Sequence, residues 1–406
     1  MRVLHIIETM SPHEGGPPRV VAGLAGAQCA AGIDAQVFCG DGSELPAHML
    51  YWRDNASPEF SAATVHTIVE PANRTYARVM ALRRWLRANV TQYDVVHIHS
   101  LWRWVPTLAA MACRQMRVPY LIAPHTALSP WALVQKRLKK GLARVLVWDR
   151  LFAAAAGFHA LNQFEADELL GIGGQPRARI FVVPNGVSLA EFSRPENSND
   201  LGMQAAYQGV KLEGKRFILF LARLHLMKGP DLLLEAFARV ANEQPDLQLV
   251  FAGPDFGMLE KLRRRTEELQ LSDRVHYPGL SSGAAKLWLL NSAVCLCQPS
   301  RSEGFSLSIL EAMASSCPVV ISDRCKFPEV RKFGAGMVVP MAVGDIAAGL
   351  SVYASDPARR LADGRAAREL IERHYTWEIV CKQAERMYVQ AVPPRVEGSA
   401  TVGQHP

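Results

Sequence analysis

Cysteine is scarce in this chain of 406 residues: there are eight, and no two of them form a Cys-x-x-Cys pair or another zinc-binding spacing. So few thiols exclude a disulfide-stapled scaffold and indicate a reducing compartment. The chain also lacks an apolar run of about 18–20 residues, which a membrane-spanning helix needs. Residues 1–7 are apolar but meet Glu8 too early for the apolar region of a signal peptide. These absences predict a cytoplasmic protein without a transmembrane helix.

Charge is present in an ordinary amount but is unevenly placed. Charged residues make up 20% of the chain and hydrophobic residues 49%, which is the balance of a folded globular protein. The length predicts two domains. Residues 66–150 hold 14 Lys and Arg against three Asp and Glu. Such a basic surface suits a membrane, an anionic lipid or a nucleic acid, and a solvated face without function is the alternative.

Short β-branched runs alternate with helical segments in two successive sets. Strands are expected at 3–7, 35–39, 64–69, 94–99, 120–123, 158–161, 180–183, 217–222, 248–252, 275–277, 294–298 and 319–322. This order predicts an α/β protein with two Rossmann-like domains, each a doubly wound parallel sheet, that face a shared cleft. We place the domains and their connections at 1–193 (N-terminal), 194–214 (linker), 215–375 (C-terminal), 376–392 (final helix) and 393–406 (disordered tail).

Two strand-to-helix junctions in the second domain carry residues suited to a phosphorylated ligand. The segment from Glu303 to Glu311 leads from a strand directly into a helix, whose first amides favour an anion. The other junction holds Arg223 and Lys228, a planar fork and a point charge that together suit a pyrophosphate. Each segment alone has an ordinary interpretation, as a helix-dipole acid or a surface pair. Together they predict a diphosphate-binding site.

These junctions resemble those of the family 4 retaining glycosyltransferases, which have the GT-B fold. Other segments similar to that family extend over nearly the whole chain: Gly15-Gly16 with Arg19, Val96-His97-Ile98-His99, Pro124-His125-Thr126, Pro184-Asn185-Gly186-Val187, Ala252-Gly253-Pro254 and Tyr375-Thr376-Trp377-Glu378. The family's usual glycine before the arginine is Ala222 here, a residue that also fits a strand end. The resemblance implies that the final helix crosses back onto the first domain.

The resemblance implies a role for each matching residue. Arg223 and Lys228 would hold the diphosphate of a sugar nucleotide, and Glu311 the ribose hydroxyls. Glu303 would hold the sugar, which His125 would reach from the acceptor side. The candidate catalytic residues are Arg223, Lys228, Glu303 and His125, and the candidate donor-binding residues are Gly15, Gly16, Gly253, Leu280, Gly304, Phe305, Ser306, Leu307 and Glu311.

The implied reaction moves a sugar from a nucleotide diphosphate sugar to a hydroxyl of a glycan, carried on a lipid, in surface polysaccharide assembly. The donor phosphate would take the acceptor's proton, with retention and without a protein nucleophile. No Asp-x-Asp motif in a suitable context appears, so we expect neither a metal nor another cofactor, and no nucleic-acid partner. A sugar-nucleotide epimerase or hydrolase of the same fold and a catalytically silent scaffold are the alternatives. A dehydrogenase is disfavoured because no Gly-x-Gly-x-x-Gly follows the first strand.

Residues 129–155 are expected to form one long amphipathic helix within the basic region. Its basic residues are Lys136, Arg137, Lys139, Lys140 and Arg144, and its apolar residues are Trp131, Val134, Leu138, Leu142, Val145 and Leu146. This composition is typical of an interfacial helix on an anionic membrane, so we expect a peripheral membrane protein. The alternative is a helix whose apolar side packs on its own domain.

Three histidines stand at predicted strand ends. We expect His125 to face the cleft. His97 lies on the opposite strand face from Val96 and Ile98 and is expected to pack in the interior. For His99 both interpretations stay open.

Overall fold

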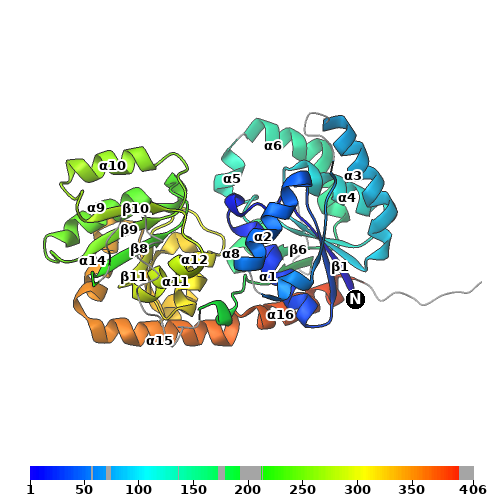
Figure 1. Cartoon of the computed structure of the whole chain (residues 1–406). Coiled ribbons are helices and arrows are strands. Elements are labelled where there is room, and N and C mark those ends of the chain that lie inside the picture. The colour runs from blue at the N-terminus through cyan, green and yellow to red at the C-terminus, as the bar shows by residue number, and fades with distance from the viewer. Residues whose placement is uncertain are drawn as a thin grey trace, which may run out of the picture.

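The computed structural model of the chain describes residues 1–55, 58–69, 75–135, 137–171, 179–192, 212 and 214–392. Two α/β domains lie side by side (Figure 1). The predicted tail lies outside the described residues, as does nearly all of the predicted linker. None of the described helices is both long and apolar enough to cross a bilayer.

The N-terminal domain is built on a parallel sheet, which in the described residues has seven strands in the order β3-β2-β1-β4-β5-β6-β7. The strands are β1 (Arg2–Ile6), β2 (Asp34–Phe38), β3 (Thr64–His66), β4 (Val95–His99), β5 (Tyr120–Ala123), β6 (Gly157–Ala160) and β7 (Ile180–Val182). One face is covered by α3 (Thr75–Asn89), α4 (Trp104–Met116), α7 (Asp149–Ala154) and α8 (Gln163–Leu170). The other face is covered by α1 (Gly16–Ala30), α2 (Leu45–Asn55) and α16 (Trp377–Ala391).

The C-terminal domain repeats this plan with a parallel sheet in the order β10-β9-β8-β11-β12-β13. Its strands are β8 (Phe217–Leu221), β9 (Gln248–Ala252), β10 (Val275–Gly279), β11 (Cys295–Gln298), β12 (Val319–Ser322) and β13 (Gly336–Val339). One face is covered by α9 (Pro230–Ala241), α10 (Leu259–Glu268) and α14 (Val343–Ser355). The other is covered by α11 (Gly283–Ser292), α12 (Leu307–Ala314), α13 (Glu329–Lys332) and α15 (Pro357–His374).

The strand orders confirm the prediction of two Rossmann-like sheets and fix where a ligand fits. In the first sheet β1 lies between β2 and β4, and in the second β8 lies between β9 and β11. At such a switch point the connections leave toward opposite faces, and a crevice opens beyond the carboxyl ends of the strands. The loops that follow these strands therefore supply the site.

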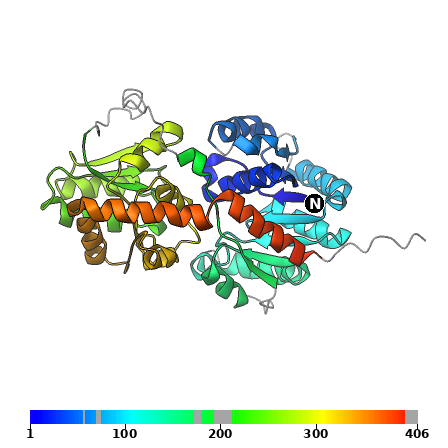
Figure 2. The ribbon, with the colours of Figure 1, turned by 90° about the horizontal axis from the view of Figure 1, so that it is seen from below.

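The last two helices join the domains. Helix α15 runs along the C-terminal domain, and α16 continues across the N-terminal domain (Figure 2). The backbone of Val187 anchors the passage: its N–H donates to the carbonyl of Tyr375 (2.9 Å), and its carbonyl accepts from the N–H of Trp377 (3.2 Å). The Trp377 indole packs so closely on α1 that a Cβ atom at Gly23 would lie 2.2 Å from it. Only glycine fits at that point of α1.

The single helix predicted at 129–155 is wrong. The chain forms α5 (Pro130–Val134), α6 (Arg137–Ala143), a π-helical segment (Arg144–Trp148) and α7. Gln135 is extended, with ψ 127°, and ends α5. The α5 carbonyls that lose their helical partners there need other donors, and the Lys140 ammonium donates to the carbonyl of Ala132 (2.6 Å). The strand β13 and the helices α2, α8 and α13 were not predicted.

Candidate active site

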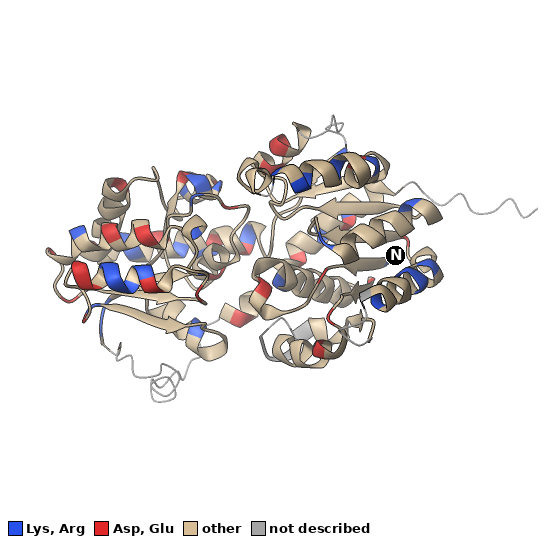
Figure 3. Ribbon diagram, turned by 90° about the horizontal axis from the view of Figure 1, so that it is seen from above, with Lys and Arg blue, Asp and Glu red and all other residues tan. Residues whose placement is uncertain are grey.

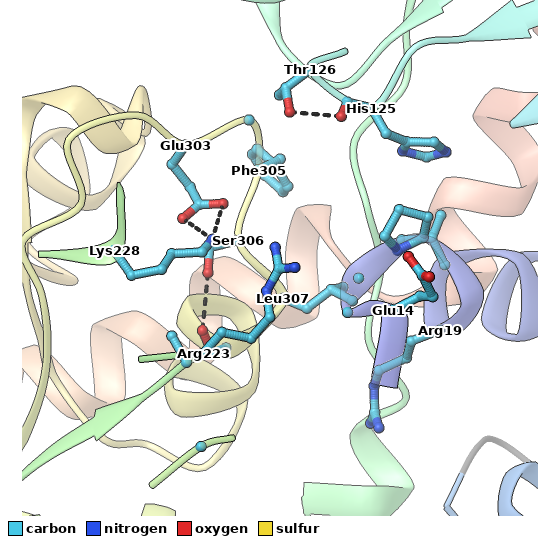
Figure 4. A pocket seen from close by; sticks show the side chains of 18 of the residues that line it. Glu14, Arg19, His125, Thr126, Arg223, Lys228, Glu303, Phe305, Ser306 and Leu307 are labelled. Carbon is cyan, nitrogen blue, oxygen red and sulfur yellow. Dashed lines mark hydrogen bonds and ion pairs between the residues drawn. The ribbon is translucent and has the colours of Figure 1, made fainter. Parts of the chain in front are cut away.

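A cleft between the domains is lined by the start of α1 and the loop after β5 on one side, and by the loops after β8, β9 and β11 on the other. All of the candidate catalytic and donor-binding residues line it. Figure 4 shows Arg223, Lys228 and Glu303 on one wall and His125, Glu14 and Arg19 on the other. The residues that the sequence places far apart are therefore brought to one place.

Lys228 and Glu303, which were assigned to different parts of a ligand, form one unit. The Lys228 ammonium contacts both carboxylate oxygens of Glu303, at 2.8 and 2.6 Å. Gln298 donates its amide N–H to the same carboxylate (2.8 Å), and the hydroxyl of Ser300 donates to it at 3.2 Å. The charge of Lys228 is thus largely offset by Glu303 before any ligand arrives.

Arg223 carries a positive charge that is available to a ligand, in the same wall of the cleft as the Lys228–Glu303 pair. Its guanidinium lies over the Phe256 ring, 5.0 Å from the ring centroid, and close to the backbone of Gly15 across the cleft. Within the described part of the chain the guanidinium forms no hydrogen bond and no ion pair. A planar cation held by stacking, with its donors unused, suits a diphosphate.

The buried amide of Gln298 was missed in the sequence and organises the start of α12. It is the last residue of β11, and its Oε1 accepts hydrogen bonds from the hydroxyls of Ser306 (3.1 Å) and Ser308 (2.8 Å). The same amide donates to Glu303, so one side chain fixes both the acid and the helix start. A polar residue that ends an otherwise apolar strand is the signal that could have found it.

Glu311 is buried in the wall of the cleft and bridges the two domains. Its Oε1 lies 3.0 Å from Nε of Arg19, on α1, and 3.1 Å from Nζ of Lys286, on α11. Burial alone would raise the pKa of the Glu311 carboxyl, but the charges of Lys286 and Arg19 together lower it below its usual value. Glu311 is therefore an ionised acceptor, and a ribose bound there would share it with two cations. Neither cation was predicted to contact it.

His125 faces the cleft, as expected, because the chain turns sharply after β5. His125 and Thr126 both have positive φ, at 49° and 66°. The Nε2 atom of His125 lies 2.9 Å from Nδ1 of His99, and the two rings stack. His99 itself is buried, so its side chain packs beneath the cleft and does not line it; His97 is buried too.

Three buried histidines in the described chain, His5, His97 and His99, have ring nitrogens within 4.8 Å of one another. Each of their ring nitrogens already makes a hydrogen bond to another side chain: to a neighbouring histidine, to Gln28 or to Tyr388. A metal ion would have to break this network. His5 and His159, which also belongs to it, were not predicted to matter, although both interrupt apolar strands.

In the basic segment at 129–150 the six apolar side chains named in the prediction are exposed, whereas Leu133, Val147 and Trp148 pack on the core of their own domain. Leu138 is 88% exposed and Leu142 62%, and Val134, Val145 and Leu146 are exposed as well. Figure 3 shows Lys and Arg along outer helices of the N-terminal domain, whereas both signs alternate on helices of the C-terminal domain.

The predicted basic residues of this segment have different surroundings. Arg137 and Lys139 are exposed. Lys140 donates to Ala132 and lies over the Trp102 ring, and Arg144 pairs with Asp149 at 3.2 Å. Lys136 lies outside the described residues. The segment adjoins the cleft, because Trp131, on α5, lines it and contacts His225 of the other domain edge-on.

Comparison with known proteins extends these observations. A family model described as Glycosyltransferase Family 4 matches residues 14–191, and one described as Glycosyl transferases group 1 matches residues 206–370. The chain is 29% identical to the D-inositol 3-phosphate glycosyltransferase of Kribbella flavida over 330 residues, 77% of this chain and 75% of that protein. It is 27% identical to the protein of the same name from Actinosynnema mirum over 400 residues, 93% and 92% of the two chains.

The fold is similar to that of Alr3699/HepE from Anabaena, solved in complex with UDP and glucose, with a TM-score of 0.75 and 18% identity over 95% of this chain and 98% of that chain. This likeness confirms the predicted GT-B architecture. One family model falls on each domain, and the curated relatives extend over both. The chain belongs to the family 4 glycosyltransferases of GT-B fold and is a transferase enzyme.

Proposed function

We propose that this enzyme transfers a sugar from a nucleotide diphosphate sugar, with retention of configuration, to a hydroxyl of a lipid-linked glycan at an anionic membrane. The observation that carries the donor is Arg223, a guanidinium without an ion-pair partner among the described residues, in the cleft beside the start of α12. UDP is bound by the structural neighbour in the same fold. Leaving-group charge on the diphosphate would be stabilised by Arg223 and Lys228.

Retention fits the groups that the cleft provides. Glu303, the carboxylate nearest the expected sugar, is held by Lys228, Gln298 and Ser300, which occupy its oxygens. A carboxylate bound in this way is a poor nucleophile. The donor phosphate would therefore take the acceptor's proton while the new bond forms on the face that the diphosphate leaves, and the cleft would orient both substrates.

The donor is tested by measuring binding of UDP-, GDP- and ADP-sugars, and then transfer with the preferred donor. We expect one nucleotide to bind markedly more tightly than the others and the product to keep the donor's anomeric configuration. Absence of binding by all three classes would overturn the proposal, and release of free sugar without an acceptor product would favour a hydrolase.

Two acceptors have specific support. The exposed apolar and basic segment beside the cleft favours a lipid-linked glycan. The names of the curated relatives favour an inositol phosphate, whose anionic group the basic N-terminal domain would attract. Incubation with the preferred donor and either membrane extract or D-inositol 3-phosphate separates them, because one product partitions into organic solvent and the other stays in water.

Membrane attachment is expected to depend on the exposed leucines of α6. Replacement of Leu138 and Leu142 by serine removes apolar area that would enter the interface, so co-sedimentation with anionic vesicles should fall at least several-fold. Leu361→Ser is the matched control, because Leu361 is 60% exposed but lies on α15 of the other domain. Attachment of the parent should also weaken as salt increases. Equal sedimentation of the double variant and the control would contradict this prediction.

Glu303→Gln is expected to separate binding from turnover. The substitution removes the carboxylate that offsets Lys228, so the ammonium becomes available to a diphosphate. We expect the free nucleoside diphosphate to bind a few-fold more tightly and the rate of sugar transfer to fall. Calorimetry with the nucleoside diphosphate and steady-state rates with donor and acceptor measure the two effects. A variant that binds more weakly and turns over normally would show that Glu303 does not hold the sugar.

A further inference from the structure

Seven side chains beneath the cleft form one continuous chain of hydrogen bonds, which starts at His125 and ends at a backbone carbonyl. They come from five elements and one loop. The half nearer the cleft joins His125 Nε2 to His99 Nδ1 (2.9 Å), His99 Nε2 to His5 Nδ1 (3.0 Å) and His5 Nε2 to Gln28 Oε1 (2.7 Å). The half nearer Val183 joins Gln28 Nε2 to Tyr388 Oη (3.1 Å), Tyr388 Oη to His97 Nδ1 (2.9 Å), His97 Nε2 to His159 Nδ1 (3.1 Å) and His159 Nε2 to the Val183 carbonyl (2.7 Å).

The five histidines of this chain are neutral. Burial lowers the pKa of His125 to about 3 and the pKa values of His5 and His159 to about 4, and it lowers those of His97 and His99 well below the ordinary value. A neutral imidazole carries one N–H and one bare nitrogen, so each ring donates on one side and accepts on the other.

The carbonyl of Val183 fixes which atom donates in each hydrogen bond of the half nearer to it, from His159 to Gln28. A carbonyl only accepts, so Nε2 of His159 carries the proton and Nδ1 is bare. His97 must then donate from Nε2, which leaves its Nδ1 as the acceptor for the Tyr388 hydroxyl. The Tyr388 hydroxyl has a single proton, which it donates to His97, so its oxygen accepts a hydrogen bond from the amide N–H of Gln28.

The orientation of the Gln28 amide then fixes the donors and acceptors in the half nearer the cleft, from His5 to His125. With its N–H toward Tyr388, its Oε1 accepts from Nε2 of His5, and Nδ1 of His5 is bare. His99 therefore donates from Nε2, and its bare Nδ1 accepts from Nε2 of His125. The opposite direction would place the bare Nε2 of His159 against the carbonyl of Val183, two acceptors 2.7 Å apart.

We propose that this chain locks His125 as the Nε2–H tautomer, and that Tyr388, on α16, is the positioning residue that transmits the lock. Nδ1 of His125, which has no hydrogen-bond partner among the described residues, then carries only a lone pair, and the side chain lines the cleft (Figure 4). The group it recognises is a hydrogen-bond donor, and a sugar or acceptor hydroxyl is the one that fits. Only that last step rests on the proposed function; the tautomer itself does not.

The tautomer is measured in the unliganded full-length enzyme by NMR of ring-¹⁵N-labelled histidine, with the His125 signals assigned by their loss in His125→Asn. We expect the parent to show a proton on Nε2 of His125 and none on Nδ1. In Tyr388→Phe the ring still fills its space, but the hydrogen bonds to Gln28 and His97 are lost. The Gln28 amide can then adopt either orientation. The Nδ1–H tautomer of His125 should then appear beside the first.

The matched control is Tyr120→Phe, which removes another buried hydroxyl from the same domain, one that donates to the carbonyl of Leu151. It should leave His125 in a single tautomer. Gln28→Met, which breaks the same link with an unbranched side chain, is the second variant if Tyr388→Phe unfolds. A proton on Nδ1 in the parent, or an unchanged tautomer in folded Tyr388→Phe or Gln28→Met, overturns the proposal. A failure of donor binding would leave the NMR result unaffected and would count against the proposed function alone.

Discussion

Arg223→Ala is expected to lower the rate of sugar transfer by about 10²–10³-fold, because the variant loses a preorganised cation that faces the charge developing on the leaving diphosphate. Nucleoside diphosphate binding should weaken as well, by about 1.5–3 kcal/mol if one charge-assisted hydrogen bond is lost. The effect should be large because Lys228, the other candidate cation, is already held by Glu303. Steady-state kinetics and calorimetry measure the two losses.

Arg263→Ala is the matched control for this experiment. Arg263 also lies over an aromatic ring, that of Tyr277 at 5.9 Å, but it does not line the cleft. It should leave transfer and binding close to those of the parent. If Arg223→Ala bound the nucleoside diphosphate as tightly as this control, the assignment of the diphosphate to Arg223 would be wrong.

Gly304→Ala is expected to lower kcat/KM by about tenfold or more while the melting temperature stays close to that of the parent. A Cβ atom at Gly304 would lie 2.2 Å from the Cγ2 methyl of Thr126, which belongs to the opposite domain. Overpacking of this kind costs about 1–3 kcal/mol. Since the clash is between the domains and not within either of them, the cost falls on their approach across the cleft.

A second substitution, at Thr126, is expected to restore the activity that Gly304→Ala loses. Thr126→Ser removes the methyl but keeps the hydroxyl, which donates to the carbonyl of His125 at 2.6 Å. The double variant Gly304→Ala/Thr126→Ser should therefore recover most of the lost kcat/KM, and Thr126→Ser alone should be near the parent. If the double variant is no better than Gly304→Ala, the loss comes from the backbone of the α12 loop and not from contact between the domains.

The two junctions of the expected diphosphate site are predictable from local patterns in the sequence. Arg223 and Glu303 each follow an apolar strand and precede a helix, and parallel strands bring their carboxyl ends to one edge of a sheet. The strand rhythm that predicts two Rossmann-like sheets supplies the rest. The roles given to Gly15, Gly16 and His125 came instead from the resemblance to the glycosyltransferase family.

The partners of these residues are not predictable in the same way, because they depend on which elements become neighbours. Glu311 contacts Arg19 only because the two domains meet across α1 and α12. The histidine chain requires β1 beside β4 and the return of α16 with Tyr388. A single sequence contains no local pattern for these encounters.

The error at residues 129–155 has a different cause. The apolar and basic residues keep a helical spacing through Gln135, so a window of sequence indicates one helix. The structure leaves the helix at Gln135 and closes the gap with the Lys140 ammonium on Ala132, a contact over eight residues that periodicity does not encode.

The docking of Trp377 and Tyr388 on the N-terminal domain has a consequence for how the protein is made. Both side chains belong to the buried core of the first sheet, yet they leave the ribosome about 200 residues after Phe192, the last described residue of the predicted N-terminal domain. At 5–20 residues per second this interval is roughly 10–40 s. During synthesis the apolar surface on α1 that α16 later covers therefore stays exposed. A stalled or truncated chain would leave this surface open to chaperones and to aggregation.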